Sequence, residues 1–216
     1  LFTVIFDPDF LKTVWYSAAR ILGGFFTALT LGTVLGWVAS RFWVVETLLR
    51  PITAVIKATP VASFIILVLL WFSGKNLSVI ISMLMVFPVI YMNVLEGIRS
   101  ADEKLLEMAQ VFRLSVGKKL LYIYLPAVAP FFVSACSVSL GLCWKSGIAA
   151  EVIGTPDGSI GAVFYQAKIF LQTSELLAWT VVVVAVSVAF EKLFMLLLRL
   201  VLKKLKMEDV LNGKRA

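Results

Sequence analysis

The sequence has 216 residues, of which 61% are hydrophobic and only 15% are charged, and its mean hydropathy is +0.98. Soluble domains average about 45–50% apolar and about 25% charged residues, so this composition excludes a disordered chain, a coiled coil and an ordinary water-soluble enzyme. The net charge of +7 fits a membrane protein better than a nucleic-acid-binding protein, because Lys and Arg gather in cytoplasmic loops. Histidine is absent, which removes the commonest general base and metal ligand.

Long uncharged runs predict membrane-spanning helices. The runs are continuous and lack the alternating pattern of an outer-membrane barrel, and helices satisfy every backbone group in lipid. The predicted helices cover roughly 14–40, 52–73, 77–97, 118–145 and 174–202. No repeat or linker divides the chain. We therefore expect an all-α, polytopic membrane protein in which residues 1–216 form a single domain.

The distribution of Lys and Arg predicts the orientation. Three stretches, 41–57, 99–119 and 199–215, hold 14 of the 20 cations, and two spans separate each stretch from the next. They therefore lie on one side, which we expect to be the cytoplasm, and the C-terminus lies there too. Residue 1 then lies outside, and because the chain begins with Leu1 and not with Met, we expect a sixth span upstream.

The loop 99–119 is the longest hydrophilic segment between spans and predicts an amphipathic helix over 101–113. Ser100 and Glu103 have the spacing of a capping box. One helical face carries Leu105, Met108, Ala109 and Phe112. Such a helix either rests on lipid or docks into a groove of a cytoplasmic partner. The acidic residues of the loop disfavour an anionic lipid surface and favour the partner.

The same loop resembles the EAA motif of ABC importer permeases. That pattern reads E-A-A, three residues, G, nine residues, I-x-L-P. Here Glu107-Met108-Ala109 is followed after three residues by Arg113, and after nine more by Ile123-Tyr124-Leu125-Pro126. Met108 replaces an alanine and Arg113 replaces the glycine. Because glycine suits a left-handed helix stop, Arg113 predicts that the turn closes differently or that the helix runs on.

Other blocks extend the resemblance over most of the chain. Trp144–Glu151 and Gly158–Gly161 are similar to blocks of the nitrate/sulfonate/taurine-type permeases. The resemblance implies a type I importer transmembrane domain in a bacterial inner membrane, in which two copies pair across a twofold axis. Each copy would dock a cytoplasmic ATPase subunit through the EAA loop, and an extracellular or periplasmic solute-binding protein would deliver the solute. A small anion such as nitrate, taurine or an alkyl sulfonate is expected, with an amino acid or a thiamine precursor as the alternative.

The chain itself is not expected to be an enzyme or to hold a cofactor or metal. It lacks the G-x-x-x-x-G-K-[ST] phosphate loop, so ATP and Mg are expected on the partner ATPase. The resemblance implies that the ATPase is contacted through the EAA loop, with the small side chain of Ala109 against it. The implied coupling residues are Glu103, Leu105, Leu106, Glu107, Met108, Ala109, Phe112, Arg113, Leu125 and Pro126.

Candidate pathway residues lie toward the other side, in and beside a segment over 146–173 that is expected to return as short helices and to form an extracellular gate. Charged residues in apolar surroundings are functional candidates, so Lys145 either pairs with Glu151 or attracts an anionic solute. Ile160, Val163 and Phe164 are candidates for the gate or for packing. The small-residue step in the first predicted helix, Gly32 and Gly36, fits helix packing or a dimer seam.

Two other classes remain as competing interpretations. A secondary transporter or channel would work without ATP, but the chain lacks an intramembrane carboxylate series for a proton relay, and its charged loop has EAA spacing. A membrane-embedded enzyme is disfavoured because there is no histidine, no paired acidic metal motif and no serine with a nearby base.

Overall fold

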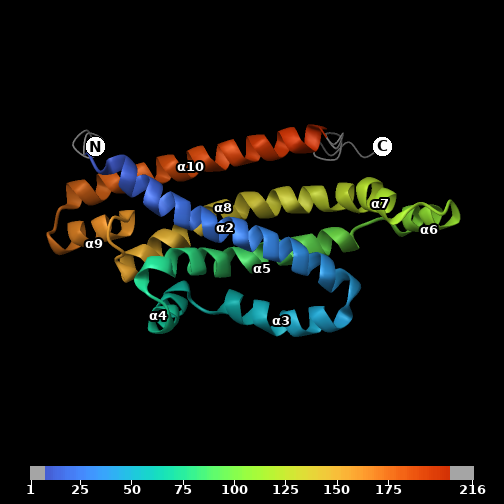
Figure 1. Ribbon diagram of the computed structural model, residues 1–216, viewed down its shortest axis with the longest axis horizontal. Coiled ribbons are helices and arrows are strands. Elements are labelled where there is room, and N and C mark those ends of the chain that lie inside the picture. The colour runs from blue at the N-terminus through green and yellow to red at the C-terminus, as the bar shows by residue number, and fades with distance from the viewer. Residues whose placement is uncertain (1–7, 205–216) are drawn as a thin grey trace.

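The computed structural model describes residues 8–204, and within that range every regular element is helical and no strand is present. Figure 1 shows the elements as a bundle of long helices with shorter ones at its two ends. In chain order they are α2 (Phe10–Arg41), α3 (Trp43–Ala58), α4 (Val61–Trp71), the 3-10 turn η1 (Gly74–Asn76), α5 (Leu77–Arg99), α6 (Glu103–Val111), α7 (Val116–Lys119), the π-helical η2 (Leu120–Tyr124), α8 (Leu125–Gly154), α9 (Ile160–Ile169) and α10 (Thr173–Lys204). The all-α prediction is confirmed.

Four helical stretches in the described range are long and apolar enough to cross a membrane: Phe10–Arg41, Gly74–Arg99, Val116–Gly154 and Thr173–Lys204. The pair α3 and α4 makes a fifth if both count as one broken span, since they are bent by 108° at the break. The helix predicted over 52–73 is therefore not continuous, because it covers the second half of α3, the break at Thr59 and Pro60, and α4.

The break between α3 and α4 has a local cause. Proline disfavours the helical conformation of the residue before it, and Thr59 precedes Pro60. Thr59 accordingly has an extended backbone, with φ −81° and ψ 132°, and α3 ends at Ala58. The chain has already reversed at Phe42, so that α3 runs back beside α5, and the break at Thr59 turns α4 across the end of the bundle (Figure 1).

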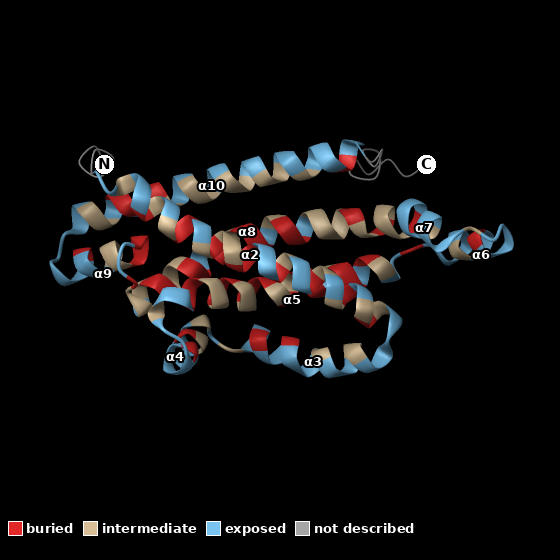
Figure 2. Cartoon of the chain, viewed as in Figure 1, coloured by how far each residue is buried: buried red, intermediate tan, exposed pale blue. Residues whose placement is uncertain are grey.

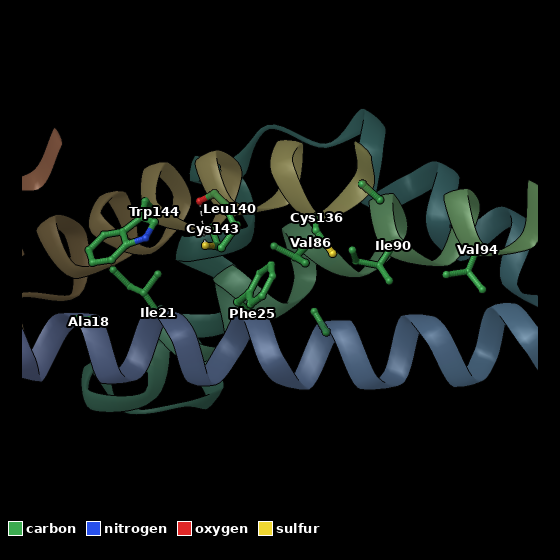
Figure 3. Packing of buried hydrophobic residues seen from close by; sticks show 12 residues of the cluster. Ala18, Ile21, Phe25, Val86, Ile90, Val94, Cys136, Leu140, Cys143 and Trp144 are labelled. Carbon is green, nitrogen blue, oxygen red and sulfur yellow. Dashed lines mark hydrogen bonds between the residues drawn. The ribbon is translucent and has the colours of Figure 1, made fainter. Parts of the chain in front are cut away.

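The core forms where α5 packs between α2 and α8. Figure 3 shows Ile21 and Phe25 of α2 facing Val86 and Ile90 of α5, with Cys136, Leu140, Cys143 and Trp144 of α8 closing the cluster. These side chains are fully or almost fully buried. Lipid tails are as apolar as these residues, so close packing, and not exclusion from water, holds spans together in a bilayer.

Glycines permit this close approach between helices. A Cβ atom on Gly24 would lie 2.4 Å from the Val79 carbonyl oxygen, whereas the adjacent Gly23 has open space. Gly32 and Gly36 face Ile90, Tyr91 and Val94 of α5 in the same way. The small-residue step of α2 therefore packs against α5 within one chain and does not line a dimer seam.

The two ends of the bundle carry different elements. Figure 1 places α6, α7 and the end of α10 at one end, and the start of α2, α4 and α9 at the other. Helix α10 lies along the outside and is the least buried of the four long spans. Only 6% of its most apolar stretch is buried, and Figure 2 colours most of the helix as exposed or intermediate. One polar contact ties it to α8, where the Ser137 hydroxyl donates to Glu191 Oε1 at 3.0 Å.

Candidate functional site

Helix α6 projects from one end of the bundle and begins at a different cap from the one predicted. Asp102 is the N-cap, and its side chain accepts a hydrogen bond from the Lys104 backbone N–H at 2.9 Å. The Ser100 hydroxyl instead donates to the Gly97 carbonyl at the end of α5. The capping box predicted at Ser100 and Glu103 is therefore wrong, although the amphipathic helix itself is present.

One face of α6 packs against its own chain. Ala109 is fully buried in a cluster with Ala101, Ile123 and Ala127, and Leu106 packs against the same cluster. The expectation that the Ala109 side chain lies against a partner protein is therefore wrong. A small residue is needed there because α6 lies close to η2 and the base of α8.

The part of the apolar stripe that flanks Ala109 on α6 is exposed. We define the apolar tip as Leu105, Met108, Val111 and Phe112 of the α6 segment and Val116 of α7, and their exposed fractions run from 43% to 80%. Glu103 and Glu107 are exposed on the same helix. Figure 2 shows this end standing clear of the bundle. An exposed apolar patch rimmed by polar residues is typical of a protein interaction site.

Arg113 ends α6 in the conformation that glycine usually takes. Its φ is 49°, in the left-handed region. The Leu114 N–H donates to the Ala109 carbonyl at 2.9 Å, and the Arg113 N–H donates to the Gln110 carbonyl at 2.9 Å. These two bonds make a Schellman motif. The expectations of a different turn or a longer helix are therefore both wrong.

We expect Arg113→Gly to stabilise the folded chain by about 0.5–1 kcal/mol. Glycine relieves the strain of about 1–2 kcal/mol that a residue with a Cβ has in the left-handed region, but it also raises the conformational entropy of the unfolded chain, which offsets part of this gain. The measurement is the thermal unfolding midpoint of the purified protein in detergent. Lys119→Gly is the control: Lys119 is helical, with φ −59°, so glycine there should destabilise by about 0.5–1 kcal/mol. Equal effects of the two changes would contradict this account of the turn.

Leu125 and Pro126 begin α8 and lie below the apolar tip, not on it. Both are half-buried, and Leu125 packs against a cluster that includes Leu202 of α10. Pro126 has no N–H and displaces the carbonyl one turn before it, which favours a local change of hydrogen-bond register. The register does change here, since the Leu125 N–H donates to the Leu120 carbonyl in a π-helical turn.

At the other end of the bundle, Glu151 joins three helices. Its side chain is fully buried on α8. Oε2 accepts a hydrogen bond from the Ser17 hydroxyl of α2 at 2.6 Å and a longer one from the Gly161 N–H of α9 at 3.4 Å. The Ser17 oxygen in turn accepts from the Ile160 N–H at 2.9 Å. Two N–H groups from the first turn of α9, which lack partners within the helix, are thus satisfied by α8 and α2.

The other candidate pathway residues divide between surface and core. Lys145 is exposed and makes no ion pair within residues 8–204, so the pairing of Lys145 with Glu151 is wrong. Ile160 is fully buried against Ala178, Trp179 and Val182 of α10, and Val163 and Phe164 pack half-buried on the same cluster. In this chain these three side chains hold α9 to α10, which is the packing alternative.

The sequence did not single out Ser17 or Gly161 as parts of this network. Gly161 is needed because a Cβ there would lie 2.3 Å from Glu151 Cβ and 2.3 Å from the Glu151 carbonyl carbon. Gly161, three residues after Gly158, was a signal in the sequence that two backbone segments approach closely there, but the sequence does not show that the second segment is α8. Ser17 carries no signal of its own, since serine at a helix–helix contact usually bonds to its own helix.

Comparison with known proteins matches residues 28–207 to the family described as the binding-protein-dependent transport system inner membrane component. The chain is 30% identical over 189 residues to a putative aliphatic sulfonates transport permease of Bacillus subtilis, covering 87% of this chain and 68% of the relative. It is 26% identical over 184 residues to the taurine transport system permease of Escherichia coli, covering 83% and 66%. A nitrate import permease of Synechococcus elongatus is 25% identical over 185 residues, covering 76% and 66%.

The fold also matches a solved structure. An amino acid ABC transporter crystallised with histidines superposes with a TM-score of 0.59 and 18% identity, covering 92% of this chain and 99% of the other. At that identity the likeness shows the fold alone. The chain spans about two thirds of the length of the permeases named above.

Proposed function

Because the chain belongs to the family of binding-protein-dependent transport system inner membrane components, we propose that it is the permease subunit of an ATP-driven importer. Two copies form the solute pathway, and each docks a cytoplasmic ATPase subunit. ATP and Mg are bound by the ATPase, and this chain has no catalytic role. A solute-binding protein on the outer side delivers a small anion, in keeping with the sulfonate, taurine and nitrate permeases it resembles.

The observation that carries this proposal is the apolar tip. Helix α6 is held to the chain by its Ala109 side and presents Met108 and Phe112 outward. A helix laid with its apolar face in a groove is a common mode of recognition between proteins. The cation-rich stretches support a cytoplasmic location for α6, and Figure 1 places the end of α10, with Lys203 and Lys204, at the same end of the bundle.

Charge on the apolar tip is expected to uncouple the importer. Phe112→Asp, and separately Met108→Asp, would place a carboxylate in the docking groove. Such a change at a central contact weakens binding by about 2 kcal/mol or more, roughly thirtyfold. The measurements are co-purification of the ATPase subunit and solute-stimulated ATP hydrolysis in the complete complex.

The matched control is Gln110→Asp, which adds the same charge to an exposed position on another face of α6. We expect it to keep near-normal coupling. Ala109→Asp would be a poor test, because it buries a charge in the chain's own cluster. Full ATP-driven uptake by both Phe112→Asp and Met108→Asp would contradict docking through α6. Purification without any nucleotide-binding partner would instead favour a secondary transporter.

A further inference from the structure

A groove outside the network around Glu151 lies between α3, α5 and α8. We call it the α5 groove, and it has a volume of about 340 Å³. Lys57, Pro88, Val89, Met92, Asn93, Glu96 and Phe131 line it. Small-molecule sites span about 300–1,000 Å³, so this groove fits a small solute.

The α5 groove carries one cation and one carboxylate, and neither is neutralised by the chain. Lys57 Nζ lies 3.5 Å from Met92 Sδ, and neither Lys57 nor Glu96 takes part in an ion pair within the described part of the chain. The Asn93 amide donates to the Val89 carbonyl at 2.8 Å, which leaves its side-chain oxygen able to accept. Two opposite charges and an amide thus line one groove, the cation from α3 and the carboxylate and amide from α5.

The depth of Lys57 in the groove makes its charge informative. Met92 is seven residues before the end of α5, which is about 10 Å at the helical rise, and residues 76–95 contain no charge. Lys57 reaches Met92 and so lies at that depth, whereas Glu96 lies about one turn from the end of α5. Ionisable groups within a span are costly when they face lipid, and they mark water-lined pathways.

We propose that the α5 groove is a solute-binding station selective for zwitterions, meaning small solutes with an ammonium group and an anionic group joined by a short alkyl chain. This inference rests on the proposed import function and narrows its substrate class from small anions in general to those that also carry an ammonium group. Glu96 receives the ammonium group, Lys57 receives the sulfonate or carboxylate, and Met92 and Phe131 contact the alkyl chain. A bare anion such as nitrate would meet Lys57 but be repelled by Glu96.

The test measures protection of a cysteine placed in the groove. Met92→Cys is labelled with a thiol reagent in membranes that hold the complete complex without nucleotide. Met92 is 37% exposed, whereas the native Cys136 and Cys143 are fully buried and give little background. Phe131→Cys is a second reporter, in case the first disturbs the groove. Lys75→Cys, exposed and outside the groove, is the control for general effects on labelling.

The probes are taurine, ethanesulfonate, ethylammonium and nitrate at one millimolar concentration. We expect taurine to slow labelling at least about fivefold and the singly charged probes less than about twofold, because only taurine satisfies both charges. Adding Glu96→Gln should remove the advantage of taurine over ethanesulfonate. Adding Lys57→Gln should reduce the protection given by taurine and by ethanesulfonate. Glu175→Gln, at the start of α10, is the matched carboxylate control and should change neither.

Two results would overturn the inference. One is no protection by taurine at either reporter. The other is equal protection by taurine and ethanesulfonate with or without Glu96, which would mean that Glu96 pairs with another chain and not with solute. If either result comes with intact ATP-driven uptake, the groove inference fails and the importer proposal stands. If taurine protects the reporter cysteine in a protein that purifies without an ATPase partner, the groove inference stands and the importer proposal fails.

Discussion

Replacing Gly161 with alanine is expected to disrupt the junction of α8 and α9 more than alanine at any other glycine within residues 8–204. The new Cβ would lie 2.3 Å from two Glu151 atoms and 2.5 Å from the Val152 nitrogen. Two of these are backbone atoms, so no side-chain rotation relieves the clash. Ordinary overpacking costs about 1–3 kcal/mol, and we expect more than about 3 kcal/mol here, with loss of uptake.

Gly141→Ala is the matched control for this change. Gly141 lies within α8, and a Cβ there would meet no atom within 4 Å. Alanine is the better helix former by about 0.5–1 kcal/mol, so this variant should be neutral or slightly stabilised. Thermal unfolding in detergent and uptake in cells are the measurements. A Gly161→Ala protein as stable and active as Gly141→Ala would show that α9 does not sit against Glu151 as described.

Loss of the buried carboxylate is the second large effect. Glu151→Ala is expected to destabilise the chain by about 2–4 kcal/mol, because it leaves the Ser17 hydroxyl and the Gly161 N–H buried, and each unpaired buried group costs about 1–3 kcal/mol. Glu151→Gln keeps an acceptor oxygen and should cost less. The unfolding midpoint in detergent and the rate of proteolysis within 155–172 are the measurements.

A double-mutant cycle separates the hydrogen bond from general packing. Ser17→Ala and Glu151→Ala, which removes the acceptor, should be non-additive by about 1 kcal/mol or more, within the range found for contacting residues. Ser40→Ala replaces Ser17→Ala in the control cycle. Ser40 is also on α2, but its hydroxyl donates to the Trp37 carbonyl of the same helix, so the control should be additive. Additivity in both cycles would remove Glu151 as the residue that anchors α9.

The positions of the spans were predictable where charged residues bound an uncharged run, and less predictable where no charged residue marks a bend or an end. Helices α2, α5 and α10 follow from uncharged runs, because a charge facing lipid is costly wherever it occurs. The run over 58–74 hides a bend, since hydropathy does not report direction; Pro60 was the available signal. Helix α8 continues nine residues beyond the predicted end at 145. Lys145 is exposed, whereas Glu151 is buried and hydrogen-bonded. The sequence alone does not show which of these two charged residues is buried.

The candidate site was predicted in outline but not in its contacts. The spacing of Leu105, Met108 and Phe112 correctly indicated an amphipathic α6. It could not show that Ala109, on the edge of the same stripe, turns inward to Ile123. The partner of Glu151 was also out of reach, because Ser17 is 134 residues away and the bond depends on how α2 crosses α8. Whether the apolar tip contacts an ATPase stays a prediction.

The sparse packing of α10 bears on the order in which the protein assembles. A helix with so little buried surface is retained mainly by the bilayer itself, and Glu191 sits inside its apolar stretch, where an isolated charge costs about 2.5–3.5 kcal/mol to insert. Its hydrogen-bond partner, Ser137, belongs to α8. Helix α10 is therefore best accommodated once α8, which precedes it in the chain, is in place, so that for these two helices synthesis order and assembly order coincide. It is also the span that detergent would separate first.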